Sequence, residues 1–283
     1  MKDRIDQIID MTARTESGGS YTAWNENDNG HGVSVGLIQF NQKRGLLPGL
    51  LQAMARVDGL SFHQRAPRYG LRLLNMSWVS EADLNEPTVK AEILALLGYG
   101  PFQQVQRDLA RTEYFTPAWK AAQEHGLTSE RWAALLFDTA VQHGPGGMRH
   151  LLALAQGHIP EGYTLAQHFA HLADGADLNG RRNRILRDPA LSDAPFDPSA
   201  PARPEPRTLR RGDAGEDVER LQLALAKAGY LHARRIDGDF GQVTEDAVIA
   251  FQACVGLDPD GIYGPATRQA LAAALTSQEK PQP

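Results

Sequence analysis

Apolar residues before position 188 recur mostly at spacings of three and four, the period of a helix with one buried face. Sets with this spacing are Ile5/Ile8/Ile9, Leu50/Leu51/Met54, Ile93/Leu94/Leu97 and Trp132/Leu135/Leu136. Residues 25–41 differ, because Asn29-Gly30 and Gly32 supply turn residues and the run VSVGLIQF is β-branched and apolar. The pattern predicts a mainly α first domain that contains one small β hairpin.

A second pattern, nearer the C-terminus, is an internal repeat. The stretch DGDFGQVT (237–244) recurs as DGIYGPAT (260–267), and each copy precedes a helical run. The glycines suit a turn, and Thr244 and Thr267 are predicted to be helix N-caps. This pattern predicts a compact module of three short helices over 208–276.

Between these regions lies a proline-rich segment, 189–207, with six of the 17 prolines of the chain. Proline-rich segments favour extended conformations, so we expect a linker here. The expected organisation is a domain at 1–188, the linker at 189–207, the helical module at 208–276 and a frayed tail at 277–283. A length of 283 residues suits two domains.

Composition and charge limit the classes of partner that we expect for this protein. The net charge is −5 and there is no long Lys/Arg run, so we expect no nucleic-acid partner. No apolar run reaches the roughly 18 residues of a membrane span, so no membrane partner is expected. The lone Cys254 excludes an intrachain disulfide, no other His or Cys pairs with His143 at metal-ligand spacing, and we expect no metal and no cofactor.

The most informative single residue is Glu16, at the end of the first predicted helix, 4–16. It lies about 20° from Ile5 around the helix axis and therefore on the buried face. Gly18 and Gly19 follow, which places the carboxylate near the negative end of the helix dipole. Burial and the dipole both predict a raised pKa, which suits a general acid. The alternative is a surface glutamate that faces solvent or pairs with Arg14 or Lys43.

The stretch 16–42 resembles the lysozyme superfamily, most closely soluble lytic transglycosylases and goose-type lysozymes, through ESG and the later GLIQF. NDNGHG (27–32) and FDTAVQHGPGG (137–147) are similar to segments of bacterial chitosanases. The resemblance implies a lysozyme-like α+β fold in which Glu16 protonates the leaving glycosidic oxygen.

A second carboxylate is needed if water is the nucleophile, at roughly 6.5–9.5 Å for inversion or about 5–5.5 Å for retention. Asp28 is the predicted base, and Glu26 is a further candidate. The chitosanase-type base aligns with Asn29, which cannot abstract a proton. A lytic transglycosylase would use Glu16 alone, because a hydroxyl of the substrate itself attacks.

Substrate contacts are predicted on and before the hairpin. Ser34 and Asn41 carry polar side chains there, and Tyr21 could pack against a sugar face. The resemblance gives Gln39 a role in contacting the substrate.

Three further residues are expected to support the site. Asp138 interrupts the apolar run WAALLFDTAV, so it needs a buried partner, and the Arg-rich segment 179–187 with Arg182 can supply one. In chitosanase-like proteins such an Asp–Arg network supports the catalytic glutamate. His143, before the glycines of HGPGG, is expected to be a helix-end residue.

Residues 209–275 are similar throughout to the three-helix peptidoglycan-binding module of cell-wall hydrolases, which implies peptidoglycan as partner. Tethering to the wall would raise the local substrate concentration. We therefore hypothesise a muramidase that cleaves the β-1,4 bond between N-acetylmuramic acid (MurNAc) and N-acetylglucosamine (GlcNAc). The rivals are a chitosanase, a lytic transglycosylase and a non-catalytic wall-binding protein.

The first residues, MKDRIDQIIDMTARTE, lack the continuous hydrophobic region of a secretory signal. We therefore expect synthesis in the cytoplasm and action in the periplasm or cell wall. Two routes fit: release of a phage endolysin through a holin, or delivery of an antibacterial effector by a secretion apparatus, with an immunity protein as a partner.

Overall fold

The computed structural model describes residues 3–28, 30, 32–75, 80–175, 180–188, 190–200 and 207–278. The chain forms two compact units. Among the described residues, the first unit runs to Leu186 and includes Leu191–Ala200, and the second unit holds the C-terminal helices. Each unit has a hydrophobic core of its own.

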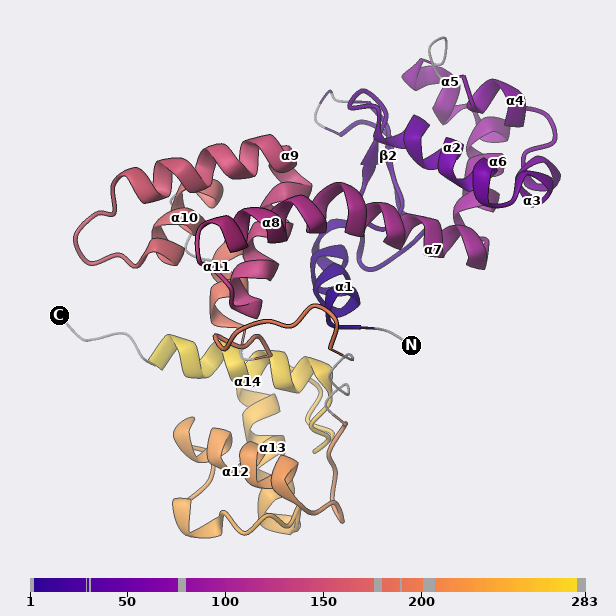
Figure 1. The fold of residues 1–283 in the computed structure, drawn as a ribbon. Helices are drawn as coiled ribbons and strands as arrows, with labels where there is room; N and C mark the ends of the chain where they lie inside the picture. The colour runs from indigo at the N-terminus through magenta and orange to yellow at the C-terminus, as the bar shows by residue number, and fades with distance from the viewer. Residues whose placement is uncertain are drawn as a thin grey trace. The chain divides into compact units, whose positions relative to one another are not determined.

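The first unit is mainly helical, with a small antiparallel sheet (Figure 1). Its elements are α1 (Arg4–Ser17), β1 (Trp24–Asn25), β2 (Ser34–Val35), β3 (Phe40–Asn41), α2 (Leu46–Val57), α3 (Gly59–Arg65), α4 (Gly70–Leu73), α5 (Glu81–Asn85), α6 (Pro87–Leu97), α7 (Gly100–Leu109), the π-helix η2 (Ala110–Phe115), α8 (Thr116–Glu124), α9 (Glu130–Gly157), α10 (Leu165–Asp174) and α11 (Arg181–Arg187). The predicted fold class, mainly α with a small β element, is confirmed.

The helices of this unit form two groups. α2 packs on α3 and α7, whereas α9 packs on α8 and α10. The run α7–η2–α8 is continuous in sequence and joins the groups (Figure 1). α1 contacts α9 and η2, while β3 contacts α2, so α1 and the sheet connect the two groups at the centre of the unit.

α1 has a well-defined beginning and end. The Asp3 and Asp6 side chains form a capping box at its N-terminus, and Ile5, Ile8 and Ile9 enter the core. The helix ends at Gly18, whose φ of 65° is left-handed and therefore suits glycine. The predicted helix over 4–16 is confirmed, and its last turn holds Glu16.

The sheet has the order β1-β2-β3, with both pairs antiparallel. The turn after β2 needs glycine at Gly36, where φ is 76° and an added Cβ would lie 2.4 Å from Gln106 Oε1. The same Oε1 accepts a hydrogen bond from the Leu37 amide at 2.9 Å. Gln106 of α7 therefore holds this turn against the helices.

The proline-rich segment differs from the prediction. Leu191 and Phe196 are buried in the core of the first unit, and Phe196 stacks edge-on against Phe115 and Trp119. The Phe196 amide also donates to Thr128 O at 2.8 Å. The linker prediction is therefore wrong for 191–200, because two apolar side chains anchor this stretch despite its prolines. Residues 189 and 201–206 of the predicted linker lie outside the described residues.

The second unit contains α12 (Glu216–Lys227), the 3₁₀ helix η3 (Ala233–Arg235), α13 (Gln242–Cys254) and α14 (Pro265–Gln278). The predicted module of three helices is confirmed. α14 extends two residues into the predicted tail, and 279–283 lie outside the described residues. Thr244 and Thr267 are not N-caps, because α13 and α14 begin two residues before them.

Both threonines instead belong to two matching polar networks. Gln222 donates to Asp237 Oδ1 (2.8 Å), Asp239 O (2.9 Å) and Thr244 Oγ1 (3.0 Å). Gln252 donates in the same way to Asp260 Oδ1 (2.7 Å), Ile262 O (3.0 Å) and Thr267 Oγ1 (3.0 Å). Each glutamine Oε1 accepts from the glycine amide of its Asp-Gly turn. The repeat in the sequence is therefore a repeat of buried hydrogen bonding.

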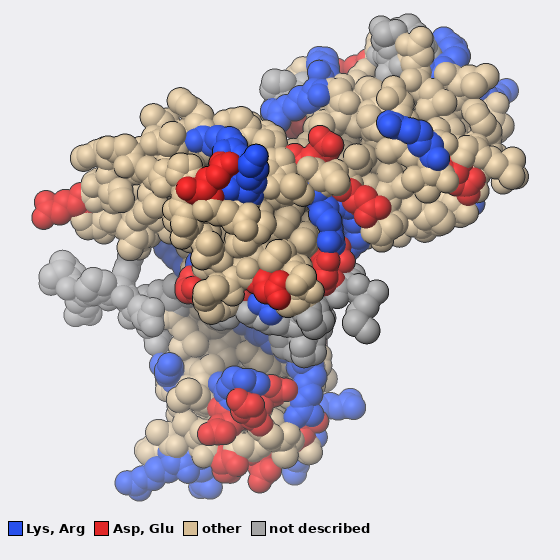
Figure 2. All heavy atoms as spheres, viewed as in Figure 1, with Lys and Arg blue, Asp and Glu red and all other residues tan. Residues whose placement is uncertain are grey.

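Charged side chains of both signs are interspersed with uncharged ones on the face seen in Figure 2. Within the described part of the chain, no helix is both long enough and apolar enough to cross a bilayer.

Candidate active site

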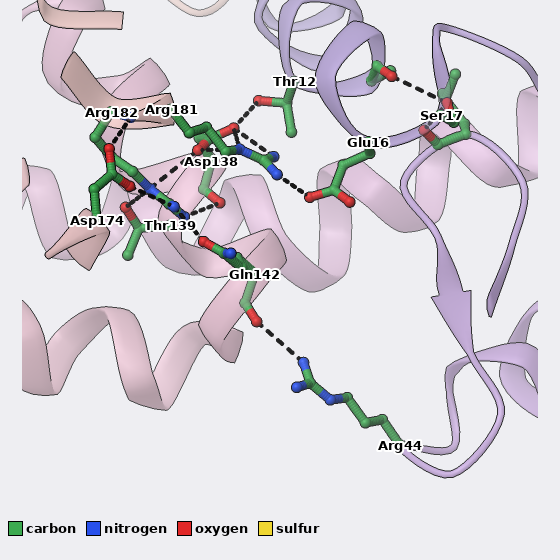
Figure 3. A network of polar contacts seen from close by, with 12 residues as sticks. Thr12, Glu16, Ser17, Arg44, Asp138, Thr139, Gln142, Asp174, Arg181 and Arg182 are labelled. Atoms are coloured by element: carbon green, nitrogen blue, oxygen red, sulfur yellow. Dashed lines mark hydrogen bonds and ion pairs between the residues drawn. The ribbon is translucent and has the colours of Figure 1, made fainter. Parts of the chain in front are cut away.

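Glu16 lies in the last turn of α1, near the sheet and the helix group formed by α8, α9 and α10. The Ser17 hydroxyl donates to Leu37 O at 2.7 Å and so fixes the end of α1 against the turn after β2. The Glu16 side chain is only 17% exposed, and its Oε1 accepts a hydrogen bond from Arg181 of α11 (Figure 3). The prediction that Glu16 turns inward is confirmed, and its alternative partners Arg14 and Lys43 are not its ion-pair partners.

Arg181 links Glu16 to the buried carboxylate of Asp138 on α9. Arg181 Nε lies 2.7 Å from each oxygen of Asp138, which is 1% exposed. Asp138 also accepts from Thr12 Oγ1 at 3.1 Å and pairs with Arg182 Nε at 3.2 Å. The predicted pairing of Asp138 with the Arg-rich segment is therefore present.

Arg182 is buried and ties α9 to the end of α10. It pairs with Asp174 at 3.0 Å, donates to Thr139 Oγ1 at 3.3 Å and to Asp138 O at 3.1 Å, and donates to the side chain of Gln142. These contacts place Arg182 in the structural support of the site, away from solvent. We call Glu16, Arg181, Asp138, Arg182 and Asp174 the Glu16 network.

The Glu16 network has three carboxylates and two guanidinium groups, so its net charge is zero when one carboxylate is protonated. Among the described residues, Glu16 accepts from Arg181 alone, whereas Asp138 has three donors. Burial raises the pKa of the Glu16 carboxyl above its ordinary value, and the nearby Asp138 charge acts in the same direction. The Arg181 guanidinium opposes both and does not reverse the direction. The predicted raised pKa is confirmed.

Asp28, the predicted base, lies before β2 and is partly exposed. The Ser34 hydroxyl donates to Asp28 Oδ2 at 2.8 Å, and Asn41 Nδ2 donates to Ser34 Oγ at 2.9 Å. Ser34 and Asn41 are themselves buried. Their predicted contact with substrate is therefore wrong in its direct form, because these polar groups are used inside the sheet to orient Asp28. Asn29 lies outside the described residues.

Two other predicted residues have structural partners. The Tyr21 hydroxyl accepts from Arg107, which also pairs with Asp10 of α1. Tyr21 is partly exposed, so the predicted packing of its ring against a sugar stays a prediction. Glu26, the alternative base, is 65% exposed and pairs with Lys90 at 2.9 Å. These contacts join neither Tyr21 nor Glu26 to a residue of the Glu16 network.

Gln39 lies in the turn between β2 and β3, and His143 lies near Arg182 and Asp174 of the Glu16 network. Gln39 has a φ of 58°, a left-handed conformation that is uncommon outside glycine and that concentrates at functional sites. It is partly exposed in the turn before β3, so its predicted substrate contact stays a prediction. His143 precedes the break in α9 at Gly144, as expected of a helix-end residue, and burial lowers its pKa.

Three residues of the site escaped the sequence analysis. Arg181 was hidden among the arginines of 181–187, since spacing alone does not show which one reaches Glu16. Arg44, after β3, donates from Nη1 to Gln142 O on α9 at 3.2 Å (Figure 3). Tyr114 is buried in η2, and burial raises its pKa to about 12. A π-helix, often found at functional sites, has no simple sequence signal.

The described residues contain no group of three His, Cys, Asp or Glu side chains placed to hold a metal ion.

Comparison with known families concerns the second unit. Residues 214–271 match the family described as "Putative peptidoglycan binding domain".

Curated relatives match over short regions. A region of 61 residues is 48% identical to the zinc D-Ala-D-Ala carboxypeptidase of Streptomyces albus G, covering 21% of this chain and 24% of that protein. A region of 114 residues is 33% identical to the N-acetylmuramoyl-L-alanine amidase CwlL of Bacillus licheniformis, covering 39% of this chain and 32% of that protein. The chain thus spans about a third or less of the length of these relatives.

Two solved chitosanase structures are similar to this chain. The native chitosanase of Bacillus subtilis MY002 has a TM-score of 0.49 at 18% identity, covering 66% of this chain and 84% of that one. The chitosanase GsCsn46A of Gynuella sunshinyii, in complex with chitotetraose, has a TM-score of 0.45 at 24% identity, covering 67% and 78%. Likeness at this level says nothing about the reaction.

Proposed function

We propose that this protein cleaves the glycan strands of peptidoglycan, with Glu16 as the general acid. The observation that carries the proposal is the inward-facing Glu16 carboxyl, whose pKa burial raises within a network that has one carboxylate in excess. A protonated carboxyl at neutral pH can donate to the leaving oxygen of a glycosidic bond. Arg181 orients the carboxyl for that transfer.

Peptidoglycan is proposed as the polymer on the strength of the second unit. The match of residues 214–271 to a peptidoglycan-binding family, together with the relatives of the chain that are named for an amidase and a carboxypeptidase, supports a cell-wall substrate. Those two relatives are named for different reactions and share only short regions with this chain. The shared regions therefore support targeting to the wall, and the first unit carries the proposed chemistry.

The proposed bond is the β-1,4 linkage between MurNAc and GlcNAc, which makes the protein a muramidase. Asp28 is proposed to activate the attacking water. The chain of hydrogen bonds from Asn41 through Ser34 to Asp28 supports this role, because it holds the carboxylate in one orientation. An orienting partner of this kind is typical of positioned catalytic groups.

One observation favours lytic transglycosylase activity as a second candidate. The carboxylate that shares Arg181 with Glu16 is Asp138, which is buried and bound by two arginines, while Asp174 pairs with the buried Arg182. Asp138 is therefore not available to activate water. A reaction that needs only one glutamate would form an anhydro end in place of a new reducing end.

The test is product analysis with purified cell walls. Glu16→Gln should abolish the release of glycan fragments while the variant still binds walls and unfolds cooperatively. The matched control is Glu124→Gln, which removes an exposed carboxylate paired with Arg149 and should retain activity. A new reducing end in the wild-type products supports the muramidase, and an anhydro end supports the transglycosylase. Full activity of Glu16→Gln would refute both.

The role of the second unit is tested by truncation. Removing 207–283 should weaken wall binding and spare the cleavage of soluble glycan strands. A second truncation that begins at 189 should instead destabilise the first unit, because it also removes the buried side chains of Leu191 and Phe196. Loss of wall cleavage without loss of wall binding in the shorter truncation would contradict the proposed division of labour.

We also propose that the protein acts outside the cytoplasm, because its proposed substrate lies there. The two proposed routes are release through a holin and delivery by a secretion apparatus. Expression with an added export signal should lyse a bacterial host, whereas expression without one should not. Protection of the host by a neighbouring gene product would favour an effector with an immunity protein.

A further inference from the structure

Arg44 lies across from the Glu16 network, on the loop between β3 and α2, and reaches α9 (Figure 3). We infer that Arg44 binds a carboxylate of the glycan strand and so selects anionic glycans for cleavage at Glu16. This inference rests on the proposed function and deepens it, because it assigns a charge to the substrate.

The first step is the local position of Arg44. α9 breaks at Gly144, where φ is 74° and ψ is 161°, and Pro145 has no amide hydrogen to donate. The carbonyl of Gln142 therefore lies at the end of the first half of α9, and Arg44 Nη1 donates to it at 3.2 Å. Cations are favoured at such helix ends. This contact holds the guanidinium in place.

The second step concerns the N–H donors of Arg44 that this contact does not use. A guanidinium has five N–H donors, and the bond to Gln142 O uses one of them. Arg44 is exposed, and the contacts of the described residues include no carboxylate bound to it. Arg181 and Arg182 differ in both respects, since their side chains are only 14% and 1% exposed and each pairs with carboxylates. Arg44 therefore presents donors to solvent in the geometry that binds carboxylates.

The third step is the connection to the proposed chemistry. Gln142 joins Arg44 to the Glu16 network, because its carbonyl accepts from Arg44 Nη1 at 3.2 Å and its side chain accepts from Arg182 (Figure 3). Arg182 belongs to the network that holds Glu16. An anion bound by Arg44 would be near the bond that Glu16 protonates.

The ligand chemistry separates the rival polymers. MurNAc carries a lactyl group that is a free carboxylate when the stem peptide is absent, and the stem peptide carries carboxylates of its own when present. Chitosan carries ammonium groups, which Arg44 would repel. The shared chemistry that Arg44 fits is a carboxylate on or next to the sugar.

The experiment compares Arg44→Gln with wild type on three soluble glycan preparations. The first is strands with stem peptides, the second is strands from which an amidase has removed the peptides, and the third is the second after its carboxylates have been neutralised by carbodiimide coupling to an amine. The measured quantity is kcat/KM for the formation of new glycan ends. The matched control is Arg56→Gln, because Arg56 is also exposed and donates to a backbone carbonyl, that of Gln52.

We expect Arg44→Gln to lower kcat/KM about 10-fold on at least one anionic preparation. A loss on the amidase-treated strands assigns the lactyl carboxylate, and a loss confined to peptide-bearing strands assigns the stem peptide. On the neutralised strands the variant and wild type should be equal. Arg44→Lys should recover part of the loss, because lysine keeps the charge without the planar fork.

Three results would overturn the inference. Equal losses on neutralised and anionic strands would show a structural role of Arg44, and no loss on either anionic preparation would show no role. A wild-type protein that cleaves none of the three preparations would overturn the proposed function as well. Active wild type with an unaffected Arg44→Gln refutes only the role of Arg44. On chitosan, Arg44→Gln should be at least as active as wild type.

Discussion

The Glu16 network and the glutamine networks of the second unit are both buried and polar, but they differ in charge and in satisfaction. Gln222 and Gln252 are neutral donors and acceptors whose partners are backbone groups, a threonine and an aspartate of their own turns. The Glu16 network joins charged groups from α1, α9, α10 and α11, with one carboxylate more than its guanidinium groups can match.

The difference indicates which network does chemistry. In the glutamine networks, hydrogen bonds lower the pKa of the Asp237 and Asp260 carboxyls, so no carboxyl there is held protonated and the networks stabilise one conformation. A network with a surplus carboxylate favours a proton on its least-bound member, which here is Glu16. Burial of polar groups is thus common to both units, and the proposed site differs in that burial raises the pKa of its Glu16 carboxyl.

The largest expected effect breaks the charged network at its buried centre. Asp138→Ala removes the carboxylate shared by Arg181 and Arg182 and leaves two guanidinium groups without it. Breaking a buried ion pair costs about 3–5 kcal/mol of unfolding free energy. Urea denaturation measures this loss. The control is Asp193→Ala, whose carboxylate is 76% exposed and should cost about 1 kcal/mol or less.

The next largest effect is expected when the glutamine networks of the second unit are broken. Gln222→Leu and Gln252→Leu each remove a buried glutamine and leave the glycine amide of an Asp-Gly turn without its acceptor, at a cost of about 1–3 kcal/mol. Because the two glutamines make matching contacts, their losses should be similar, and both should weaken wall binding before they affect catalysis. Thermal unfolding and wall sedimentation measure the two outcomes. Gln242→Leu, at an exposed glutamine, is the control. Clearly unequal losses of stability in Gln222→Leu and Gln252→Leu would show that the two copies of the repeat do not contribute equally to stability.

The pH dependence of activity sharpens the assignment of the acid. Because burial raises the pKa of Glu16, the active protonated form persists above the ordinary value of 4.5 and is lost as pH rises through the raised pKa. The rate of glycan cleavage should therefore fall on the alkaline side, whereas wall binding should not follow the same curve. A rate that rises through this range would contradict Glu16 as the acid.

The smallest effect is on stability. The fold favours protonated Glu16, so this residue contributes stability that is present below the ordinary pKa and is lost as pH rises through the raised pKa. Glu16→Gln resembles the protonated form, and it should unfold at a higher urea concentration than wild type near pH 7 and at nearly the same concentration near pH 4. A variant that is less stable than wild type near pH 7 would show that the ion pair with Arg181 outweighs burial.

Much of the local structure could be predicted because its causes lie close together in the chain. The periodicity of Ile5, Ile8 and Ile9 predicted α1, and Gly18 predicted its end. Position on the helix face also predicted that Glu16 turns inward. The proline content of 191–200, in contrast, predicted a linker, because nothing local shows that Phe196 fits between Phe115 and Trp119.

The sequence by itself determined the helices, the turn chemistry, the two units and the inward direction of Glu16, since each depends on residues within a few turns of one another. Tertiary structure decided which partners those groups meet. Arg181 lies 165 positions after Glu16, Asp138 lies 126 positions after Thr12, and Arg44 lies 98 positions before Gln142. Such pairs form only when packing of the hydrophobic core brings distant segments together, and neither periodicity nor spacing records that event.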